Sequence, residues 1–441
     1  MDNISDIMIN QPTINVGVIG SVSDGKTTIT EKLTDVKTQK HSSETKNNIT
    51  IKLGYANVKI YKCNTCSPPS CYQPFASSVY DANCKLCNEK MILVKHISIV
   101  DSPGHNTLMT TMLNGTSIMD TSILVEAINN KPMPASQTEE HIIASNIVGL
   151  HNTLICINKM DLVAQNNAKN IINGFKQYLI DKNYDRFINS PIIPIIANHN
   201  INIDIICHYL ANIEQPIRDM GVTDIKLIIV RSFNVNKPDV SIKELKGGVI
   251  GGTILKGKLK LNDKIILYPG IIEKNNENDS KNDSKNENKH KWTYMPIKST
   301  IISIHSENNS LQYAIPGGLL GVQLTIDPSL TAKDALIGNI LTYQDNNNYK
   351  IYESIDVTIE LNTNISLQKN DAIIINSNAA TTNANVVSIK GKKARLRLID
   401  KPLCVDINDQ KVTLTMKQNN NIHIIGGAKI YNGIECKLKQ Y

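Results

Sequence analysis

The sequence predicts an α/β domain built on a parallel-rich sheet, followed by two β-barrel domains. In the first half, short apolar segments alternate with segments long enough for helices, and these apolar segments are 14–19, 96–100, 122–127, 153–157 and 192–196. Such alternation favours parallel strands covered by helices on both faces. From about residue 225, short strands follow one another with turn residues every eight to twelve positions, which favours a barrel. The segment from 346 to 441 repeats this all-β pattern.

The length of 441 residues fits about three domains at roughly 150 residues each. We expect boundaries at 1–216, 217–345 and 346–441, with the third domain shortened. A tract without apolar residues, 273–291, cannot be buried and is expected to be a flexible loop of the second domain.

Charge and hydropathy exclude several classes of protein. The net charge of +7 is small for a DNA-wrapping protein, so we expect no DNA partner. The longest apolar runs are far shorter than the roughly 18 residues of a membrane helix, and the N-terminus has no secretory pattern. We therefore expect a cytoplasmic protein without a membrane partner, in which paired cysteines indicate metal or redox chemistry.

A phosphate-binding loop joins the first expected strand to the first expected helix. The pattern Gly20-x-x-x-x-Gly25-Lys26-Thr27 fits the P-loop in full, and Thr28 follows it in the helix. Glycines let backbone N–H groups face phosphate, the lysine supplies a positive charge between the β- and γ-phosphates, and the Thr27 hydroxyl can ligate Mg²⁺.

Two further motifs follow expected strands and narrow the nucleotide to guanine. Asp101 ends one strand, where it can hold the Mg²⁺ shell, and Gly104 can offer its N–H to a γ-phosphate. Asn158-Lys159-Met160-Asp161 follows another, and the Asp161 carboxylate can accept the N1–H and exocyclic amine of guanine. Adenine lacks that donor pair, so these motifs together predict a GTPase domain that binds GTP and GDP.

Two CxxC pairs lie between these motifs, in an insertion at about 61–90. Cys63 and Cys66 are separated by 17 residues from Cys84 and Cys87, a spacing typical of a four-thiolate Zn²⁺ site. Free buried cysteines or a thioredoxin-like redox pair are the alternatives, although no helix start follows either pair. Cys71 between the pairs is a spare thiol or an alternative ligand.

Longer segments resemble the translational GTPases, and more narrowly the gamma subunit of eukaryotic and archaeal translation initiation factor 2. The segments that carry the resemblance are 48–56, 100–120, 136–141, 231–238, 245–252 and 311–319. The resemblance implies a GTP-dependent factor that binds initiator methionyl-tRNA, delivers it to the small ribosomal subunit and hydrolyses GTP. It also implies alpha and beta partner subunits and agrees with a zinc knuckle.

The same resemblance implies roles for individual residues. Thr50 would ligate Mg²⁺, His105 would position the attacking water, and Val22 with Ile49 would flank it as an apolar gate. Ala197 would lie in the loop near guanine. The aminoacyl end of the tRNA would be held near two places, and these are Tyr55 and the segment of Arg231.

The P-loop departs from the family pattern at two places. Translational GTPases usually have His where this chain has Ser21 and Asp24. Asp24 either places an extra carboxylate beside the phosphates, which lowers nucleotide affinity, or points outward or helps hold a cation. We expect GTP binding with slow intrinsic hydrolysis. The alternatives are a selenocysteine-type elongation factor and a gamma-subunit mimic that does not cycle nucleotide.

Overall fold

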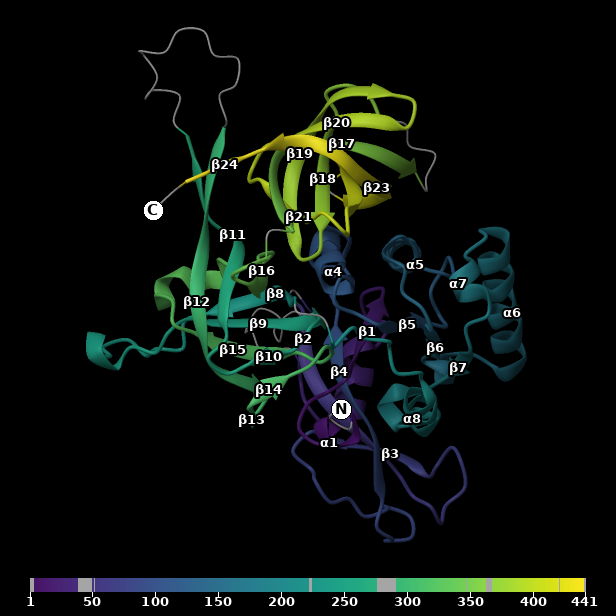
Figure 1. The fold of residues 1–441 in the computed structure, drawn as a ribbon. Helices are drawn as coiled ribbons and strands as arrows, with labels where there is room; N and C mark the ends of the chain where they lie inside the picture. The colour runs from purple at the N-terminus through teal and green to yellow at the C-terminus, as the bar shows by residue number, and fades with distance from the viewer. Residues whose placement is uncertain are drawn as a thin grey trace, which may run out of the picture. The chain divides into compact units, whose positions relative to one another are not determined.

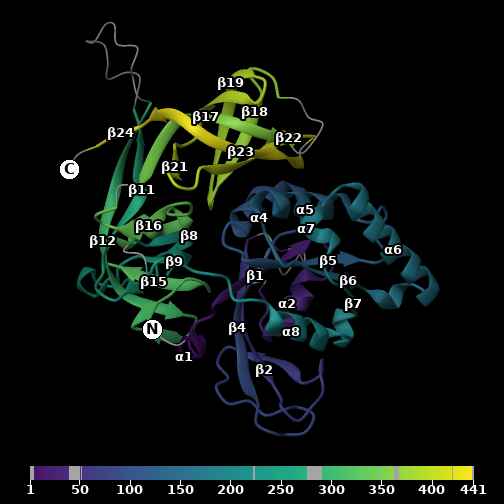
Figure 2. The same cartoon turned by 45° about the vertical axis from the view of Figure 1, so that its right-hand side comes forward.

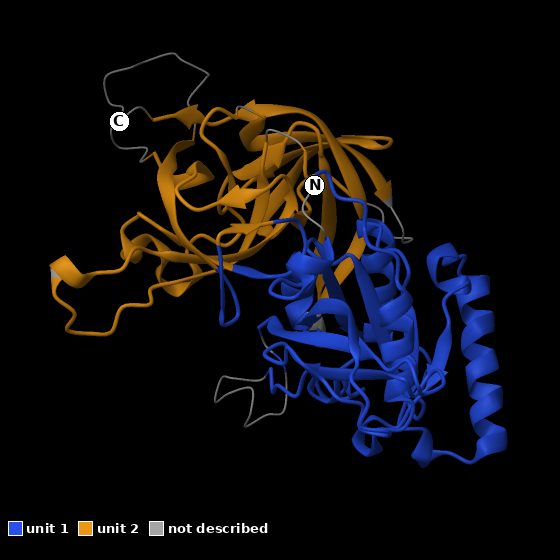
Figure 3. Cartoon of the chain, turned by 60° about the horizontal axis from the view of Figure 1, so that its bottom comes forward, with its two compact units in different colours: residues 1–219, 305–311, 315–320 blue, residues 220–304, 312–314, 321–441 orange. Residues whose placement is uncertain are grey.

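A computed structural model describes residues 4–38, 50, 52–221, 224–275, 291–346, 348–361, 367–419 and 421–439. The chain divides into two compact units, coloured blue and orange in Figure 3. The first unit contains residues 1–219, 305–311 and 315–320, and the second contains the remainder. Each unit is described separately below.

A seven-stranded sheet forms the centre of the first unit (Figure 1), in the order β3-β2-β4-β1-β5-β6-β7. The strands β4, β1, β5, β6 and β7 run parallel, whereas β2 is antiparallel to both of its neighbours. The bounds are β1 Ile14–Gly20, β2 Gly54–Lys62, β3 Tyr72–Ala76, β4 Ile92–Asp101, β5 Thr121–Ala127, β6 Leu154–Asn158 and β7 Ile192–Pro194. The parallel-rich α/β prediction is confirmed, and each of the five apolar segments forms a strand.

The antiparallel pair β2–β3 was not predicted. The predicted insertion at about 61–90 begins inside β2 and contains β3, so the strands continue into it rather than ending before it. Lys59, Lys62 and Gln73 interrupt the apolar pattern of these strands. Part of the sheet is therefore encoded by residues whose pattern does not resemble that of a buried parallel strand.

Helices cover both faces of this sheet. In Figure 2, α4 and α5 lie above the strands, and α2 and α8 lie below them. The α-helices of the unit are α1 Ile4–Met8, α2 Lys26–Thr34, α4 Met109–Thr116, α5 Ser136–Val148, α6 Gln165–Asp181, α7 Asp185–Ile188 and α8 Ile203–Asn212, with 3-10 turns η1 Asn106–Leu108, η2 Met160–Leu162 and η3 Ala197–His199. Coverage on both faces explains why every residue of β1 and β5 is buried.

The first barrel of the second unit is a ring of six strands in the order β11-β16-β8-β9-β15-β12, closed by pairing of β12 with β11. The strands are β8 Lys226–Phe233, β9 Val249–Lys256, β11 Lys264–Lys274, β12 Trp292–Ser306, β15 Leu320–Leu324 and β16 Ile340–Tyr343. Shorter elements of the second unit are β10 Leu259–Lys260, β14 Tyr313–Ala314, η4 Ile242–Glu244 and η6 Pro328–Asp334, whereas β13 Asn309–Leu311 belongs to the first unit. Closure of the ring leaves no long open edge in this sheet.

The second barrel is another ring of six strands, in the order β20-β19-β18-β22-β23-β17, closed by pairing of β17 with β20. Its strands are β17 Tyr349–Leu361, β18 Ala372–Ser377, β19 Ala380–Lys390, β20 Lys393–Leu398, β22 Lys411–Gln418 and β23 Asn421–Glu435, and β21 Leu403–Asp406 pairs with β17. In β20, exposed Lys393, Arg395 and Arg397 alternate with buried apolar residues. This period of two places the apolar side chains inside the ring.

The last strand, β24 Lys437–Leu438, pairs in parallel with β12 of the first barrel. The two barrels therefore belong to one compact unit, while the three-domain boundaries stay a prediction from the sequence. Most of the expected flexible loop, 276–290, lies outside the described residues; its first two residues, Glu273 and Lys274, belong to β11. No helix in the described part of the chain has the length and apolar content needed to cross a membrane.

Candidate functional site

The P-loop lies between the carboxyl end of β1 and the first turn of α2. Gly25 precedes the helix with a φ of 100°, a left-handed conformation that favours glycine. A Cβ atom on Gly25 would lie 2.3 Å from Nδ2 of Asn158, so a side chain here would displace the predicted guanine motif. The glycine therefore serves both the turn and the close approach of two motifs that are far apart in sequence.

Beside the loop is a cavity of about 520 Å³. This volume is within the usual range of small-molecule sites, about 300–1,000 Å³. Its lining consists of the P-loop, the guanine motif and neighbouring segments: Val22, Ser23, Gly25, Lys26, Thr27, Thr28, Thr50, Gly104, Asn158, Lys159, Asp161, Leu162, Ile196, Ala197 and Asn198. The structure thus brings most of the predicted nucleotide residues to one cavity.

Lys26 is buried at the base of this cavity. Its Nζ atom donates a hydrogen bond to the Ser21 carbonyl at 2.6 Å. Burial lowers the pKa of Lys26, and the charges of Asp101, Asp24 and Glu126 oppose that shift. The lysine is therefore a buried cation surrounded by carboxylates, next to the space where phosphates would lie.

The three predicted Mg²⁺ residues lie together at one side of the cavity. The Thr27 hydroxyl donates to Asp101 Oδ2 at 2.9 Å, and Oγ1 of Thr50 is 3.1 Å from Oγ1 of Thr27. Thr38, which sequence reasoning missed, donates its hydroxyl to the same Asp101 oxygen at 2.6 Å. Hydroxyl and carboxylate oxygens are the hard ligands that Mg²⁺ prefers, so this donor set fits the ion.

Asn158 joins the guanine end of the cavity to the P-loop. Its Nδ2 donates to the Asp24 carbonyl at 2.8 Å, and its Oδ1 accepts the Ala197 N–H at 3.1 Å. The side chain thereby fixes three loops, while Asp161 stands in the lining with its carboxylate available to a base. Lys159 lines the same part of the cavity.

Five of the residues predicted to bind or hydrolyse the nucleotide are absent from the cavity lining or lie outside the described residues. Gly20 and Asp24 belong to the P-loop but do not line the cavity, and Asp101 is connected to the lining through Thr27. His105 is also absent from the lining, and its Nδ1 atom is 2.9 Å from the Thr107 hydroxyl. Ile49 lies outside the described residues.

The Asp24 carboxylate is buried and faces the protein interior. Its Oδ2 accepts the backbone N–H of Ser21 at 3.1 Å, and its Oδ1 accepts Nδ2 of Asn130 at 2.9 Å. Burial raises the pKa of Asp24, while the hydrogen bond from Asn130 and the charge of Lys26 oppose the shift. The carboxylate therefore ties the loop together from behind rather than joining the cavity lining.

The first turn of α5 holds the loop at a second place. Oε1 of Gln137 accepts the Ser21 hydroxyl at 2.6 Å and the Val22 N–H at 3.1 Å. Sequence reasoning assigned no contact to Gln137, Asn130 or Glu126. The available signal was the charge of Glu126 inside an otherwise uncharged, buried strand.

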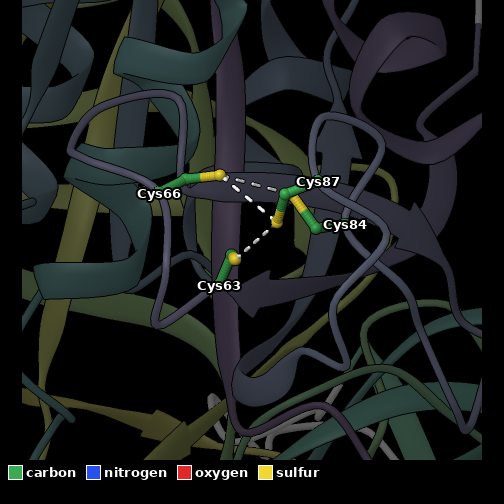
Figure 4. A group of neighbouring side chains, drawn as sticks. All are labelled: Cys63, Cys66, Cys84 and Cys87. Carbon is green, nitrogen blue, oxygen red and sulfur yellow. Dashed lines mark hydrogen bonds between the residues drawn. The ribbon is translucent and has the colours of Figure 1, made fainter.

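The four cysteines of the two CxxC pairs converge (Figure 4), with all four sulfurs within 4.8 Å of one another. The distances are 3.5 Å for Cys63–Cys87, 3.7 Å for Cys66–Cys84 and 3.6 Å for Cys66–Cys87. A tetrahedral ion with bonds of about 2.3 Å requires sulfur separations of roughly 3.8 Å. The four thiols therefore fit a metal ion, and they are the one such group among the described residues.

Neighbouring N–H groups prepare one of these sulfurs to carry negative charge. The Cys84 sulfur accepts the Leu86 N–H at 3.4 Å and Nε2 of Gln73 at 3.3 Å. Burial acts to raise the pKa of Cys84, but backbone N–H groups outweigh it and hold the pKa at about 6. Cys71 is buried outside the group of four, in the hydrophobic core, where burial raises its pKa.

The two residues expected near tRNA lie in different compact units. Tyr55 is in β2 of the first unit. Arg231 is in β8 of the second unit, where its Nε donates to Asp334 Oδ1 at 3.0 Å. Their role in tRNA binding stays a prediction.

Comparisons with families of known proteins match two parts of the chain. Residues 11–216 match the family described as the elongation factor Tu GTP binding domain. Residues 348–430 match the family described as initiation factor eIF2 gamma, C terminal. The first family explains the P-loop and guanine motifs, and the second is specific to one kind of initiation factor.

Solved structures show the same fold at low sequence identity. A bacterial selenocysteine-specific elongation factor aligns with a TM-score of 0.67 and 18% identity, over 95% of this chain and 58% of that chain. The elongation factor SelB from Methanococcus maripaludis, in complex with the GTP analogue GPPNHP, aligns with a TM-score of 0.67 and 20% identity, over 96% and 80%. At these identities the likeness shows the fold alone.

Full-length relatives are more similar in sequence. The chain is 37% identical to the gamma subunit of eukaryotic translation initiation factor 2 from Schizosaccharomyces pombe, over 98% of this chain and 96% of the relative. Identity to subunit 3 of the same factor from Drosophila melanogaster is 36%, over 97% and 90%, and to the gamma subunit from Encephalitozoon cuniculi 37%, over 98% and 96%. The chain belongs to the family of translation initiation factor 2 gamma subunits.

Proposed function

We propose that this chain binds GTP in the cavity beside the P-loop and uses it to carry initiator methionyl-tRNA to the small ribosomal subunit. The full-length identity of 37% to gamma subunits carries this proposal. It is supported by the common cavity that P-loop and guanine-motif residues line. Alpha and beta subunits are expected partners, and the cytoplasm is the expected place of action.

In the proposed complex, the P-loop N–H groups and Lys26 bind the phosphates, and the Asp161 carboxylate accepts the two donors of guanine. Thr27, Thr50 and Asp101 would hold Mg²⁺, which supplies charge neutralisation to the β- and γ-phosphates. Lys26 is pre-positioned by its bond to Ser21, so it needs only to exchange a carbonyl for phosphate oxygens. Binding therefore requires little rearrangement of this side chain.

For GTP hydrolysis we propose that His105 orients the attacking water and that Val22 and Ile49 flank it. His105 stands next to Gly104, which lines the cavity. Its ring is held by Thr107 instead of by a residue of the cavity lining. Slow intrinsic hydrolysis follows, because the water-orienting group must first turn toward the phosphates.

The metal proposed for the four cysteines is Zn²⁺, with a structural role. Four protein sulfurs complete a tetrahedral shell and leave no open position for a substrate. Cys63 and Cys84 also belong to the same hydrophobic core cluster as Ile14 and Val16 of β1. A bound ion would therefore stabilise the edge of the sheet that carries β2 and β3.

Filter binding of initiator methionyl-tRNA, with GTP or with GDP, tests the carrier function. We expect tighter binding with GTP. Equal binding in both states would support a mimic that does not cycle nucleotide, and preference for another aminoacyl-tRNA would support a selenocysteine-type factor. Lys26→Met should abolish the GTP effect, whereas Lys37→Met, at an exposed position of the same region, should retain it.

A further inference from the structure

A chain of hydrogen bonds connects Glu126 at the end of β5 to the backbone of the P-loop. The amide nitrogen Nδ2 of Asn130 donates to Glu126 Oε1 and to Asp24 Oδ1, both at 2.9 Å. Asp24 Oδ2 in turn accepts the Ser21 N–H at 3.1 Å. Glu126 follows Val125, which pairs with Gly20 in the sheet, so the glutamate stands directly behind the loop.

The two carboxyl groups in this chain are both removed from solvent. Asp24 is 1% exposed and Glu126 is 0% exposed. One amide nitrogen supplies a hydrogen to each of them, so it cannot separate two full negative charges well. Like charges that share a dry site are costly, and such pairs lower the cost by keeping one proton.

The hydrogen-bond donors show which of the two keeps the proton. Asp24 accepts from a backbone N–H and an amide, and it faces the charge of Lys26. Glu126 accepts the Ala135 N–H and the same amide through Oε1. Its Oε2 has no hydrogen bond of normal geometry among the described residues, although the neighbouring Thr138 hydroxyl acts to lower the pKa of Glu126. Since an ionised oxygen without a donor is costly to bury, Glu126 is the better place for the proton.

Two other titratable groups, Lys26 and His141, lie near this pair. Lys26 interacts with Asp24, Glu126 and Asp101, which opposes the effect of burial on its pKa. His141 on α5 is fully buried, and burial lowers its pKa to about 3, so it stays neutral. Burial, followed by the charge of Asp24, raises the pKa of Glu126 to about 7.

We propose that Glu126 is a positioning residue for the phosphate loop, acting through Asn130 and Asp24, and that its protonated form holds the loop in the shape that binds nucleotide. This inference rests on the proposed GTP binding. Loss of the proton places a second negative charge behind the site of the phosphates. The Glu126 and Asp24 carboxylates then repel each other. The hydrogen bond that positions the Ser21 N–H is then disturbed, and the affinity for phosphate falls with it.

The sign of the pH effect follows from linkage. Nucleotide phosphates add negative charge near Glu126, so its pKa is higher in the complex than in the free protein, and binding takes up a proton. The affinity for nucleotide is therefore constant below the pKa that Glu126 has in the nucleotide-free protein. Above it, affinity falls by up to about tenfold per pH unit.

The test measures the dissociation constant of fluorescent GDP and GTP, with saturating Mg²⁺, between pH 6 and pH 8.5. Glu126→Gln keeps the shape of a protonated carboxyl group and cannot ionise. We expect equal affinity for the variant and the natural chain at pH 6, and tighter binding by the variant at pH 8.5. The titration of the nucleotide itself is common to both proteins and cancels in the ratio. Glu139→Gln on α5, away from the loop, should retain the natural pH profile.

A second variant separates this role from a merely structural one. Asp24→Asn retains an acceptor for the Ser21 N–H but removes the charge that raises the pKa of Glu126. Without that charge the pKa of Glu126 falls, so the midpoint of the affinity profile should move to lower pH. An unchanged midpoint, or a Glu126→Gln profile that parallels the natural one, overturns the inference. Absence of saturable binding at every pH would instead contradict the proposed function.

Discussion

Nζ of Lys226 lies 3.1 Å from Oδ2 of Asp406, an ion pair in which the two side chains are only 6% and 4% exposed. Lys226 begins β8 of the first barrel and Asp406 ends β21 beside the second. Asp409, at 3.6 Å, is a second carboxylate partner for the same lysine. A buried charge joins the two barrels, so removal of one partner leaves the other uncompensated.

Lys226→Met should destabilise the second unit by about 3–5 kcal/mol, because the Asp406 carboxylate stays buried without its counter-ion. Urea denaturation followed by circular dichroism measures the loss. Lys350→Met is the matched control, since its ion pair with Glu435 is about half exposed and is expected to contribute little to stability. Equal effects of the two substitutions would contradict this account.

Protein purified without chelator should contain about one zinc ion per chain, measured by elemental analysis. Cys66→Ser or Cys84→Ser removes one of four thiolates and should lower the zinc content sharply. Cys71→Ser leaves the group of four intact and should retain the ion. A stable, metal-free natural protein, or loss of zinc in the Cys71 variant alone, would refute the four-sulfur assignment.

Asp161→Asn should change the preferred nucleotide of the site from GTP to xanthosine triphosphate. Loss of the carboxylate removes hydrogen bonds from guanine worth about 1.5–3 kcal/mol each, whereas the new amide can donate to the xanthine carbonyl. Competition binding with both nucleotides measures the change. Asp185→Asn, at an exposed position on α7, should leave the preference unchanged. If Asp161→Asn still favours GTP, Asp161 does not read the base.

Acid should destabilise the first unit through two buried histidines. Burial lowers the pKa of His96 and of His141 to about 3, whereas unfolded histidine titrates near about 6.5. The unfolded chain therefore binds more protons below that pH. The stabilisation is complete above about pH 6.5 and is lost by up to about 1.4 kcal/mol per pH unit per histidine as the pH falls toward 3.

The slope of unfolding free energy against pH, from urea denaturation, measures this loss. His141→Gln should make the slope shallower by one proton, while His199→Gln, at an exposed position, should leave it unchanged. An unchanged slope in the His141 variant would contradict the assignment. The readout is the slope, so a general loss of stability in the variant does not obscure the result.

The sequence predicts features that depend on neighbours along the chain. Lys26 and Thr27 follow a glycine loop between a strand and a helix, and the order of the motifs brings Asp161 to the same edge of the sheet. The cysteine pairs are predicted equally well, because ligand spacing is local. For these features, period and spacing are sufficient.

Features that depend on one contact between distant segments could not be predicted. The direction of the Asp24 side chain was left open, and it is decided by Asn130, more than 100 positions away. Thr38 joins Asp101 in the same way. Glu126 was a visible anomaly in a buried strand, but its effect on Ser21 requires the three-dimensional path through two other side chains.

The pairing of β24 with β12 gives the second unit an unusual mechanical property. The main chain leaves the first barrel near Tyr343, builds the second barrel, and returns at Lys437 to hydrogen-bond with the first. The two barrels are thus connected by the backbone at two separate points, which restricts their relative rotation more than a single linker would. Reorientation of one barrel against the other would break the hydrogen bonds between β24 and β12.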